Sequence, residues 1–143
     1  MSTVFTKIIE GELPGRFLWQ DEQCVAFLDI SPLSYGHTLV VPREEIDMWT
    51  EIPEDLNAHL YLVASRIGNA QVKSLGAARA GMMIAGYEVP HLHLHVFPTQ
   101  SLADFDLSKV MREPDQDKMD DAAIKLRAGL RDAGFGAFVP EDD

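Results

Sequence analysis

The segment His91-Leu92-His93-Leu94-His95-Val96 places a histidine at every second position, with an aliphatic residue after each one. A β-strand turns successive side chains to opposite faces, so this segment predicts three imidazoles on one face and three aliphatic groups on the other. Imidazole titrates close to neutral pH, and neighbouring copies can therefore divide the roles of nucleophile, proton donor and ligand. The segment predicts a chemically active face attached to a hydrophobic core.

Strand and helix patterns surround this segment. Short runs rich in β-forming residues, bounded by turn residues, predict strands at residues 16–19, Cys24–Leu28, 37–41, 80–85 and 90–98. Apolar residues recur at helical spacing between Pro53 and Gly76, at Leu56, Leu60, Val63, Ile67 and Ala70. This order predicts an α+β meander, an antiparallel five-stranded sheet with one long helix.

The 143 residues fit one compact domain. We expect a core over residues 1–98 and an acidic C-terminal extension over residues 99–143, packed on the same domain. Met119, Ala123, Leu126 and Leu130 predict one helix in this extension, and we expect Glu141, Asp142 and Asp143 to fray.

Composition excludes several classes of function. The formal net charge of −11 argues against a protein that coats nucleic acid, because backbone binding requires clustered Lys and Arg. No stretch approaches the ~20 apolar residues of a membrane helix, and residues 1–7 do not resemble a leader, so we expect a cytoplasmic protein without membrane contact. Cys24 is the only cysteine, which excludes an intrachain disulfide.

Two chemistries suit three histidines on one strand face. Side chains at i and i+2 lie ~6.5 to 7 Å apart, so two imidazoles can share a metal ion while the third lies too far away. A zinc site would then need a further ligand from His37, Glu88 or Asp29. The alternative is nucleophilic attack on phosphorus, in which one imidazole forms a covalent phosphoramidate and a neighbour protonates the leaving group.

The segment from His91 to Phe97 resembles the signature of the histidine triad (HIT) family. Three more stretches resemble the other landmarks of this family in the same order, namely residues 5–9 (FTKII), 26–32 (AFLDISP) and 36–42 (GHTLVVP). The resemblance spans residues 3–98 and leaves the C-terminal extension without a counterpart. It implies a HIT-like fold, a homodimer with a sheet continuous across two subunits, and a pocket for a nucleoside monophosphate.

The resemblance also implies roles for individual residues. By position, His93 is the nucleophile, His95 lies near the leaving group, His91 orients His93 through its backbone carbonyl, and His37 supports the cluster. Residues in the positions of the nucleotide pocket are Phe5, Ile8, Phe27, Leu28, Asp29 and Ile30. The apolar members of this set can equally be core, and Asp29 can equally begin the turn before Ser31.

The chain departs from the family pattern just before the histidines. Where active relatives carry an amide, a Gly-Gln pair and a hydroxyl that contact phosphate, this chain has Ala80, Gly86-Tyr87 and Glu88. Tyr87 can replace one donor through its hydroxyl. Glu88 can equally point to solvent, act as a proton donor, bind an amino group on the leaving part of the substrate or ligate a metal. We include Tyr87 and Glu88 among the residues expected beside the nucleotide. A carboxylate repels a phosphate by ~1 kcal/mol at 4 Å in water and ~4 kcal/mol at an effective dielectric of 20.

These features predict a nucleotide hydrolase or nucleotidyl transferase that needs no cofactor. It would cleave a purine nucleoside phosphoramidate or a dinucleoside polyphosphate at the α-phosphate through a covalent intermediate on His93. One alternative is a nucleotide sensor with little turnover. The other is a zinc-dependent hydrolase with His91, His93, His37 and Glu88 as ligands.

Overall fold

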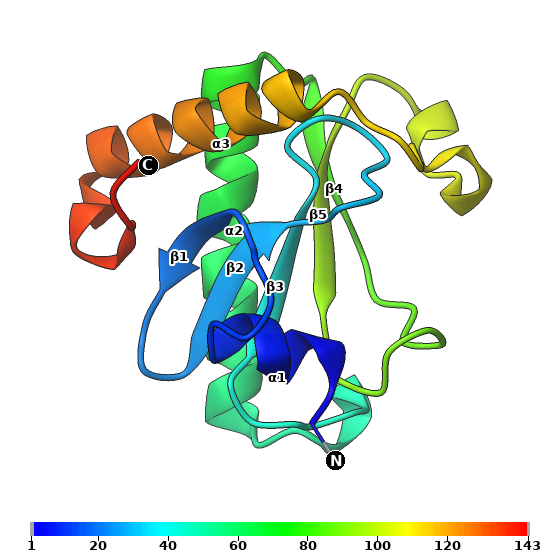
Figure 1. Ribbon diagram of the computed structural model, residues 1–143, viewed down its shortest axis with the longest axis vertical. Helices are drawn as coiled ribbons and strands as arrows, with labels where there is room; N and C mark the ends of the chain where they lie inside the picture. Colours follow the sequence, from blue (N-terminus) through cyan, green and yellow to red (C-terminus); the bar gives the residue numbers. More distant parts are fainter. Residues whose placement is uncertain (1, 143) are drawn as a thin grey trace.

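The computed structural model describes residues 2–142. The elements in chain order are α1 Val4–Ile9, β1 Phe17–Gln20, β2 Cys24–Leu28, β3 Thr38–Pro42, α2 Glu54–Leu75, β4 Arg79–Met83, β5 Leu94–Thr99 and α3 Gln116–Leu130, with single 3-10 turns between several of them. Within the described residues, the strands form one antiparallel five-stranded sheet in the order β1-β2-β3-β5-β4 (Figure 1). The predicted α+β fold is therefore confirmed.

Helices cover both faces of this sheet. The long helix α2 lies behind it in the view of Figure 1, and α1 lies in front. Leu92, Leu94 and Val96 join the large core cluster that contains the apolar stripe of α2. Phe5 of α1 belongs to a second cluster on the opposite face, with Val25, Phe27, Leu39 and Val41. The aliphatic residues between the histidines thus anchor the segment to α2, as the alternation predicts.

The boundaries of α2 follow from its caps. Pro53 precedes its first turn, which also carries Glu54 and Asp55, where negative charge favours the positive end of the helix. Gly76 ends the helix with φ +71°, a left-handed conformation that glycine adopts without steric cost. Both predicted ends are confirmed.

The final strand starts later than predicted, at Leu94 rather than at residue 90. Its partners stop there on both sides: Val40 of β3 pairs with Leu94, and Met83 of β4 pairs with His95. Pro98 lies inside the strand instead of ending it. It is tolerated because β3 begins at Thr38, opposite Val96, and no strand flanks Pro98 on that side.

Other boundaries differ by one or two residues. His37 precedes β3, which runs from Thr38 to Pro42, and β4 covers Arg79–Met83 rather than residues 80–85. The sequence did not predict α1, because six residues are too few to show a helical repeat. Its signal is the hydroxyl of Thr3, which accepts a hydrogen bond from the Thr6 amide as an N-cap.

The C-terminal extension lies against the core through α3, which crosses α2 in Figure 1. Arg127 of α3 donates a hydrogen bond to the carbonyl oxygen of Phe17 and pairs with Asp142. Asp142 also pairs with Arg131, Asp143 lies outside the described residues, and the expected fraying of Glu141 and Asp142 stays a prediction. The division into a core and an extension stays a prediction.

No helix within residues 2–142 combines the length and the apolar character needed to cross a membrane.

Candidate active site

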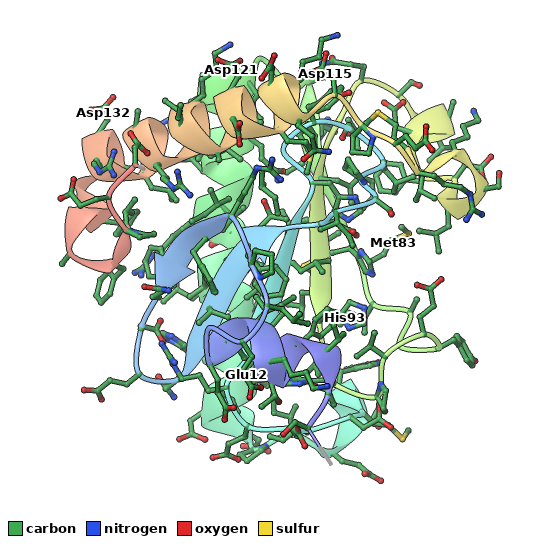
Figure 2. All side chains as sticks on the ribbon, in the orientation of Figure 1. Glu12, Met83, His93, Asp115, Asp121 and Asp132 are labelled. Carbon is green, nitrogen blue, oxygen red and sulfur yellow. The ribbon has the colours of Figure 1, made fainter. Side chains whose placement is uncertain are left out.

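Four histidines gather on the face of the sheet that α1 covers. His95 lies on β5, His37 just before β3, and His91 and His93 in the extended segment that leads into β5. Their rings are largely buried rather than forming an open surface, since His91 is 0% and His93 6% exposed. The Phe5 ring packs edge-on against His93 with 4.8 Å between ring centres, and Figure 2 shows His93 beside α1. Phe5 of α1 therefore packs over His93 and His91.

The orientation of His93 is fixed by a backbone carbonyl. Nδ1 of His93 lies 2.8 Å from the carbonyl oxygen of His91. A carbonyl oxygen only accepts hydrogen bonds, so Nδ1 carries the ring proton. In the neutral imidazole this leaves the lone pair on Nε2, which is the form that a nucleophile requires.

His91 is held at both ring nitrogens. Nε2 lies 2.7 Å from the carbonyl oxygen of Pro42, so this nitrogen carries the proton. Nδ1 lies 2.7 Å from the hydroxyl of Thr3 and accepts a hydrogen bond from it. With both nitrogens engaged, His91 acts as a rigid support that presents its own backbone carbonyl to His93.

The tautomer of His95 is set through His37. The Leu33 amide donates to Nδ1 of His37 at 2.9 Å, so the proton of neutral His37 resides on Nε2. His37 Nε2 lies 2.9 Å from Nδ1 of His95 and donates to it. His95 therefore carries its proton on Nε2, whereas His93 carries its proton on Nδ1. One ring offers a lone pair and its neighbour offers a proton, with 4.9 Å between their centres.

Burial favours the neutral form of His37, His91 and His95. It lowers the pKa of His37 to about 3 and the pKa of His95 to about 4, with the nearby His93 adding to both shifts. Burial also lowers the pKa of His91, against the opposing hydrogen bond to Pro42. Neutral forms of His37, His91 and His95 agree with the tautomers derived from their hydrogen bonds.

The Asp29 carboxylate stabilises the turn that follows β2 and also lies near two of the histidines. One carboxylate oxygen accepts a hydrogen bond from the Ser31 amide at 2.9 Å, as expected for a residue that begins a turn. The other oxygen lies 3.7 Å from His37 Nε2 and 4.0 Å from His95 Nδ1. Burial is the largest influence on this carboxyl group and raises its pKa.

The other residues predicted for a nucleotide pocket divide into three groups. Phe5, Ile8 and Phe27 pack together on the histidine face. Leu28 lies in the cluster against α2, on the opposite face, because alternate residues of β2 face opposite ways, and its place in a nucleotide pocket stays a prediction. Ile30 and Tyr87 are 75% and 98% exposed, and Glu88 is also exposed. Within residues 2–142, Ile30, Tyr87 and Glu88 make no hydrogen bond to a histidine ring.

The predicted zinc ligands do not fit a metal ion in this arrangement. The histidine-rich group with donor atoms close enough to share an ion is Asp29, His37 and His95, and it includes neither His91, His93 nor Glu88. Both nitrogens of His37 are engaged, because Leu33 donates to Nδ1 and Nε2 holds the proton. His37 would have to give up the Leu33 hydrogen bond to offer Nε2 to a metal.

Sequence reasoning missed three groups that orient the rings. The Thr3 hydroxyl had a signal, since threonine is a preferred N-cap. The Leu33 amide and the Pro42 carbonyl gave no signal in the sequence, because every residue has such backbone groups whatever its side chain. Their places depend on how the chain enters and leaves β3.

Comparison with known proteins identifies the class of this site. The model of the HIT domain matches residues 10–102, most of the chain. The chain belongs to the histidine triad (HIT) family.

Individual relatives agree with this assignment. An uncharacterized HIT-like protein of Methanocaldococcus jannaschii is 32% identical over 77% of this chain and 96% of its own length. Adenylylsulfatase HINT3 of Arabidopsis thaliana is 32% identical over 90% of this chain and 67% of its own length. The crystal structure of a zinc-bound histidine triad family protein from Mycobacterium smegmatis superposes with a TM-score of 0.81 and 32% identity, covering 93% of this chain and 96% of that one.

Proposed function

We propose that this protein is a HIT-type hydrolase or nucleotidyl transferase that cleaves a purine nucleotide at its α-phosphate. The observation that carries the proposal is the opposed pair of tautomers on His93 and His95, derived from the contacts with the His91 carbonyl and with His37. A nucleophile needs a free lone pair and a leaving group needs a proton, and this pair supplies both without a metal ion.

In the first step, the lone pair on Nε2 of His93 attacks the α-phosphorus, and the bond from phosphorus to the leaving nitrogen or oxygen breaks. His95 gives its Nε2 proton to the leaving group as the bond breaks, and the negative charge that this leaves on the His95 ring is matched by the positive charge that forms on the adjacent His93 ring. The imidazolium character that develops on His93 is stabilised by its Nδ1 hydrogen bond to the His91 carbonyl. His37 stays neutral and holds His95 in place.

In the second step, water attacks the same phosphorus, the bond from phosphorus to Nε2 of His93 breaks, and the electron pair returns to His93. His95, now with a lone pair on Nε2, removes a proton from this water, and the product is a nucleoside monophosphate. The adenylylsulfatase name of the Arabidopsis relative supports an adenylylated compound as one substrate to test. The leaving group of the substrate defines whether the bond cleaved is P–N or P–O.

We propose that two copies of the chain form a dimer along β4. Arg79–Met83 is an edge strand, with backbone groups free on its outer side in the described chain. Met82 and Ile84 are 43% and 37% exposed at this edge. Analytical ultracentrifugation tests the dimer, and a species of 15.9 kDa at micromolar concentration would contradict it.

The central experiment compares wild type, His93→Asn and His93→Gly on a panel of adenosine and guanosine phosphoramidates, dinucleoside polyphosphates and adenylyl sulfate. We expect both variants to lose at least 10³-fold in kcat. Added imidazole should restore part of the activity of His93→Gly, because it occupies the space of the missing ring. Wild-type turnover by His93→Asn would contradict the proposal.

Calorimetry on the same panel distinguishes a sensor from an enzyme. Tight binding of AMP or GMP without turnover of any compound would favour the sensor, for which the exposed Tyr87 and Glu88 in place of phosphate donors are the supporting observation. Metal analysis of protein purified without a metal-affinity tag tests the zinc alternative, which the zinc-bound relative from M. smegmatis keeps relevant. Independence from cofactors and a cytoplasmic location stay predictions.

A further inference from the structure

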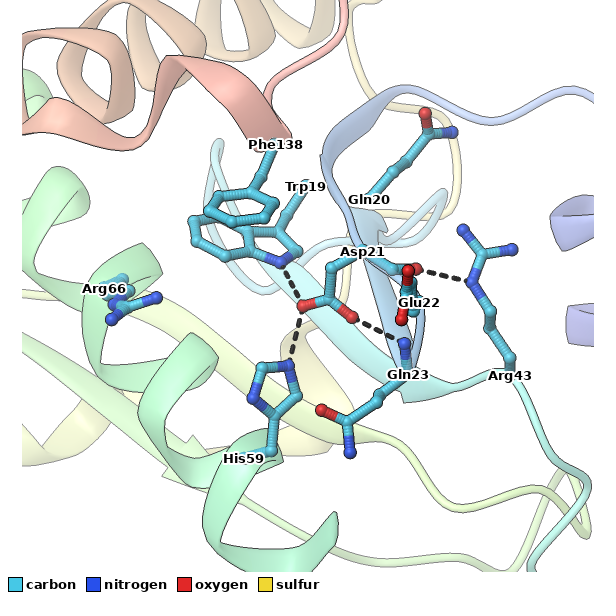
Figure 3. A pocket seen from close by; sticks show the side chains of 9 residues that line it. All are labelled: Trp19, Gln20, Asp21, Glu22, Gln23, Arg43, His59, Arg66 and Phe138. Atoms are coloured by element: carbon cyan, nitrogen blue, oxygen red, sulfur yellow. Dashed lines mark hydrogen bonds and ion pairs between the residues drawn. The ribbon is translucent and has the colours of Figure 1, made fainter.

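A groove of about 710 Å³ lies between the β1–β2 turn, α2 and the C-terminal segment, and shares no residue with the histidine site. Figure 3 shows its lining, which includes Asp21 and Gln23 from the turn, Arg43 from the end of β3, His59 and Arg66 from α2, and Phe138. His59 is the one histidine of the chain outside the candidate active site. The groove therefore contains chemistry that the proposed function does not use.

Asp21 fixes the orientation of His59. The Asp21 carboxylate accepts hydrogen bonds from the Trp19 indole at 2.8 Å and from the amides of Gln23 and Cys24 at 2.7 and 2.8 Å. His59 Nε2 lies 2.6 Å from the same carboxylate and donates its proton to it. Both carboxylate oxygens are thus occupied, which leaves Asp21 poorly suited to bind a cation.

The second nitrogen of His59 is unused. Nδ1 has no hydrogen-bond partner among residues 2–142, and Figure 3 shows it on the side of the ring away from Asp21. The carboxylate of Asp21 therefore acts as a positioning group that leaves one polar edge of His59 available in the groove.

Two guanidinium groups in the lining have no carboxylate partner in the described part of the chain, and Figure 3 shows them on opposite sides of Asp21. Arg66 lies over the Phe135 ring at 4.3 Å and over Trp19 at 5.5 Å, so its plane is held by aromatic contact while its N–H edge remains unpaired. Arg43 donates through Nε to the carbonyl oxygen of Asp21 at 2.7 Å and keeps its other N–H groups unpaired.

These cations are notable in a protein with a net charge of −11, where carboxylates outnumber basic residues and were available as partners. The carboxylates in the lining are Asp21, whose oxygens are occupied, and the exposed Glu22. A planar guanidinium held in place matches the geometry of a phosphate or carboxylate, and little side-chain entropy remains to be lost on binding.

We propose that the groove is a second ligand site that binds a small phosphate monoester, with Arg66 as its main anchor and His59 Nδ1 as a hydrogen-bonding group for the ligand, while Arg43, on the other side of Asp21, adds positive charge to the lining. The exposed part of the Phe138 ring forms an apolar wall for the organic portion of such a ligand. The C-terminal extension thereby completes the site.

Inorganic phosphate is the probe for the test, with sodium chloride at matched ionic strength as the control for screening. Trp19 forms part of the lining and the chain has one other tryptophan, so a Trp49→Phe background makes the fluorescence specific for the groove. We expect a saturable change in Trp19 emission with phosphate and none with chloride. Arg66→Gln should weaken the apparent affinity about tenfold, and Arg112→Gln, at an exposed arginine outside the groove, should change it less than twofold.

Calorimetry of the same variants measures affinity independently of any effect of Arg66→Gln on Trp19 emission. Arg66→Lys keeps the charge without the planar fork and should give an intermediate loss. Equal affinity for Arg66→Gln and Arg112→Gln, or the absence of saturable binding, would overturn the proposal. Loss of the Trp19 response in His93→Asn would place the phosphate at the histidine site and would also overturn it.

Discussion

The hydroxyl of Thr3 lies 2.7 Å from Nδ1 of His91, so the residue that caps α1 also holds a buried histidine. Thr3 accepts a hydrogen bond from the Thr6 amide and donates one to the ring. Helix α1 in turn places Phe5 against His93. One side chain therefore both caps the N-terminal helix and helps to orient His91.

Replacing Thr3 with valine should destabilise the protein by about 1–3 kcal/mol, because both the cap and the partner of a buried ring nitrogen are lost. Thr3→Ser keeps the hydroxyl and should stay within about 0.5 kcal/mol of wild type. Urea denaturation measures both values. Equal stability of Thr3→Val and Thr3→Ser would show that the hydroxyl has no role.

The free energy of unfolding should fall as the pH is lowered, because the buried histidines resist protonation. Unfolded histidine titrates near pH 6.5, whereas burial lowers the pKa of His37 to about 3 and that of His95 to about 4 in the folded protein. Between pH 6.5 and about 3 the unfolded chain binds more protons, so the free energy of unfolding decreases as the pH falls through this window.

Urea denaturation at pH 7.5, 6, 5 and 4 measures this dependence. His37→Phe removes one of the titrating groups and should flatten the profile, even if it lowers stability at neutral pH. A wild-type profile as flat as that of the variant between pH 6.5 and 4 would rule out His37 as a source of the effect.

Gly36 should not tolerate a side chain. Its φ of +102° is unfavourable for other residues, and an added Cβ would overlap the Leu75 side chain and press on Pro98. We expect Gly36→Ala to destabilise by about 2–4 kcal/mol, from strain and overpacking together. Because Gly36 precedes His37, turnover should fall as well.

Gly11→Ala is the matched control, since Gly11 has φ +83° with open space around the added Cβ. It should cost only the backbone strain, about 1 kcal/mol. Thermal unfolding of the two variants separates backbone strain from overlap with the Leu75 side chain. An equal loss of stability in both variants would mean that the overlap with Leu75 is relieved at no cost.

Glu88→Gln should strengthen the binding of an anionic nucleotide. Burial is the largest influence that raises the pKa of Asp29, and the charge of Glu88 raises it further, by less than the Ser31 amide and His93 lower it. Removing about 1 kcal/mol of repulsion should lower KM or the dissociation constant of AMP about fivefold. Glu113→Gln, at an exposed glutamate in the C-terminal extension, is the control, and an equal effect of both would point to net charge alone.

Much of the fold could be predicted because the relevant signals are local. The stripe of α2 and its caps at Pro53 and Gly76 lie in adjacent turns, and the alternation from His91 to Val96 marks two faces of one segment. Strand ends were less predictable. The start of β5 at Leu94 depends on where β3 and β4 stop, which is a property of the sheet and not of the strand.

The sequence by itself determined that imidazoles and aliphatic groups occupy opposite faces, because the pleat of an extended chain requires it. It also marked the family through the order of its motifs. Only the tertiary structure decided which nitrogen of each ring holds the proton, since the partners are the backbone groups of Leu33, His91 and Pro42. It likewise joined Asp21, His59 and Arg66, which lie far apart along the chain, because packing α2 against the sheet brings distant side chains into one groove.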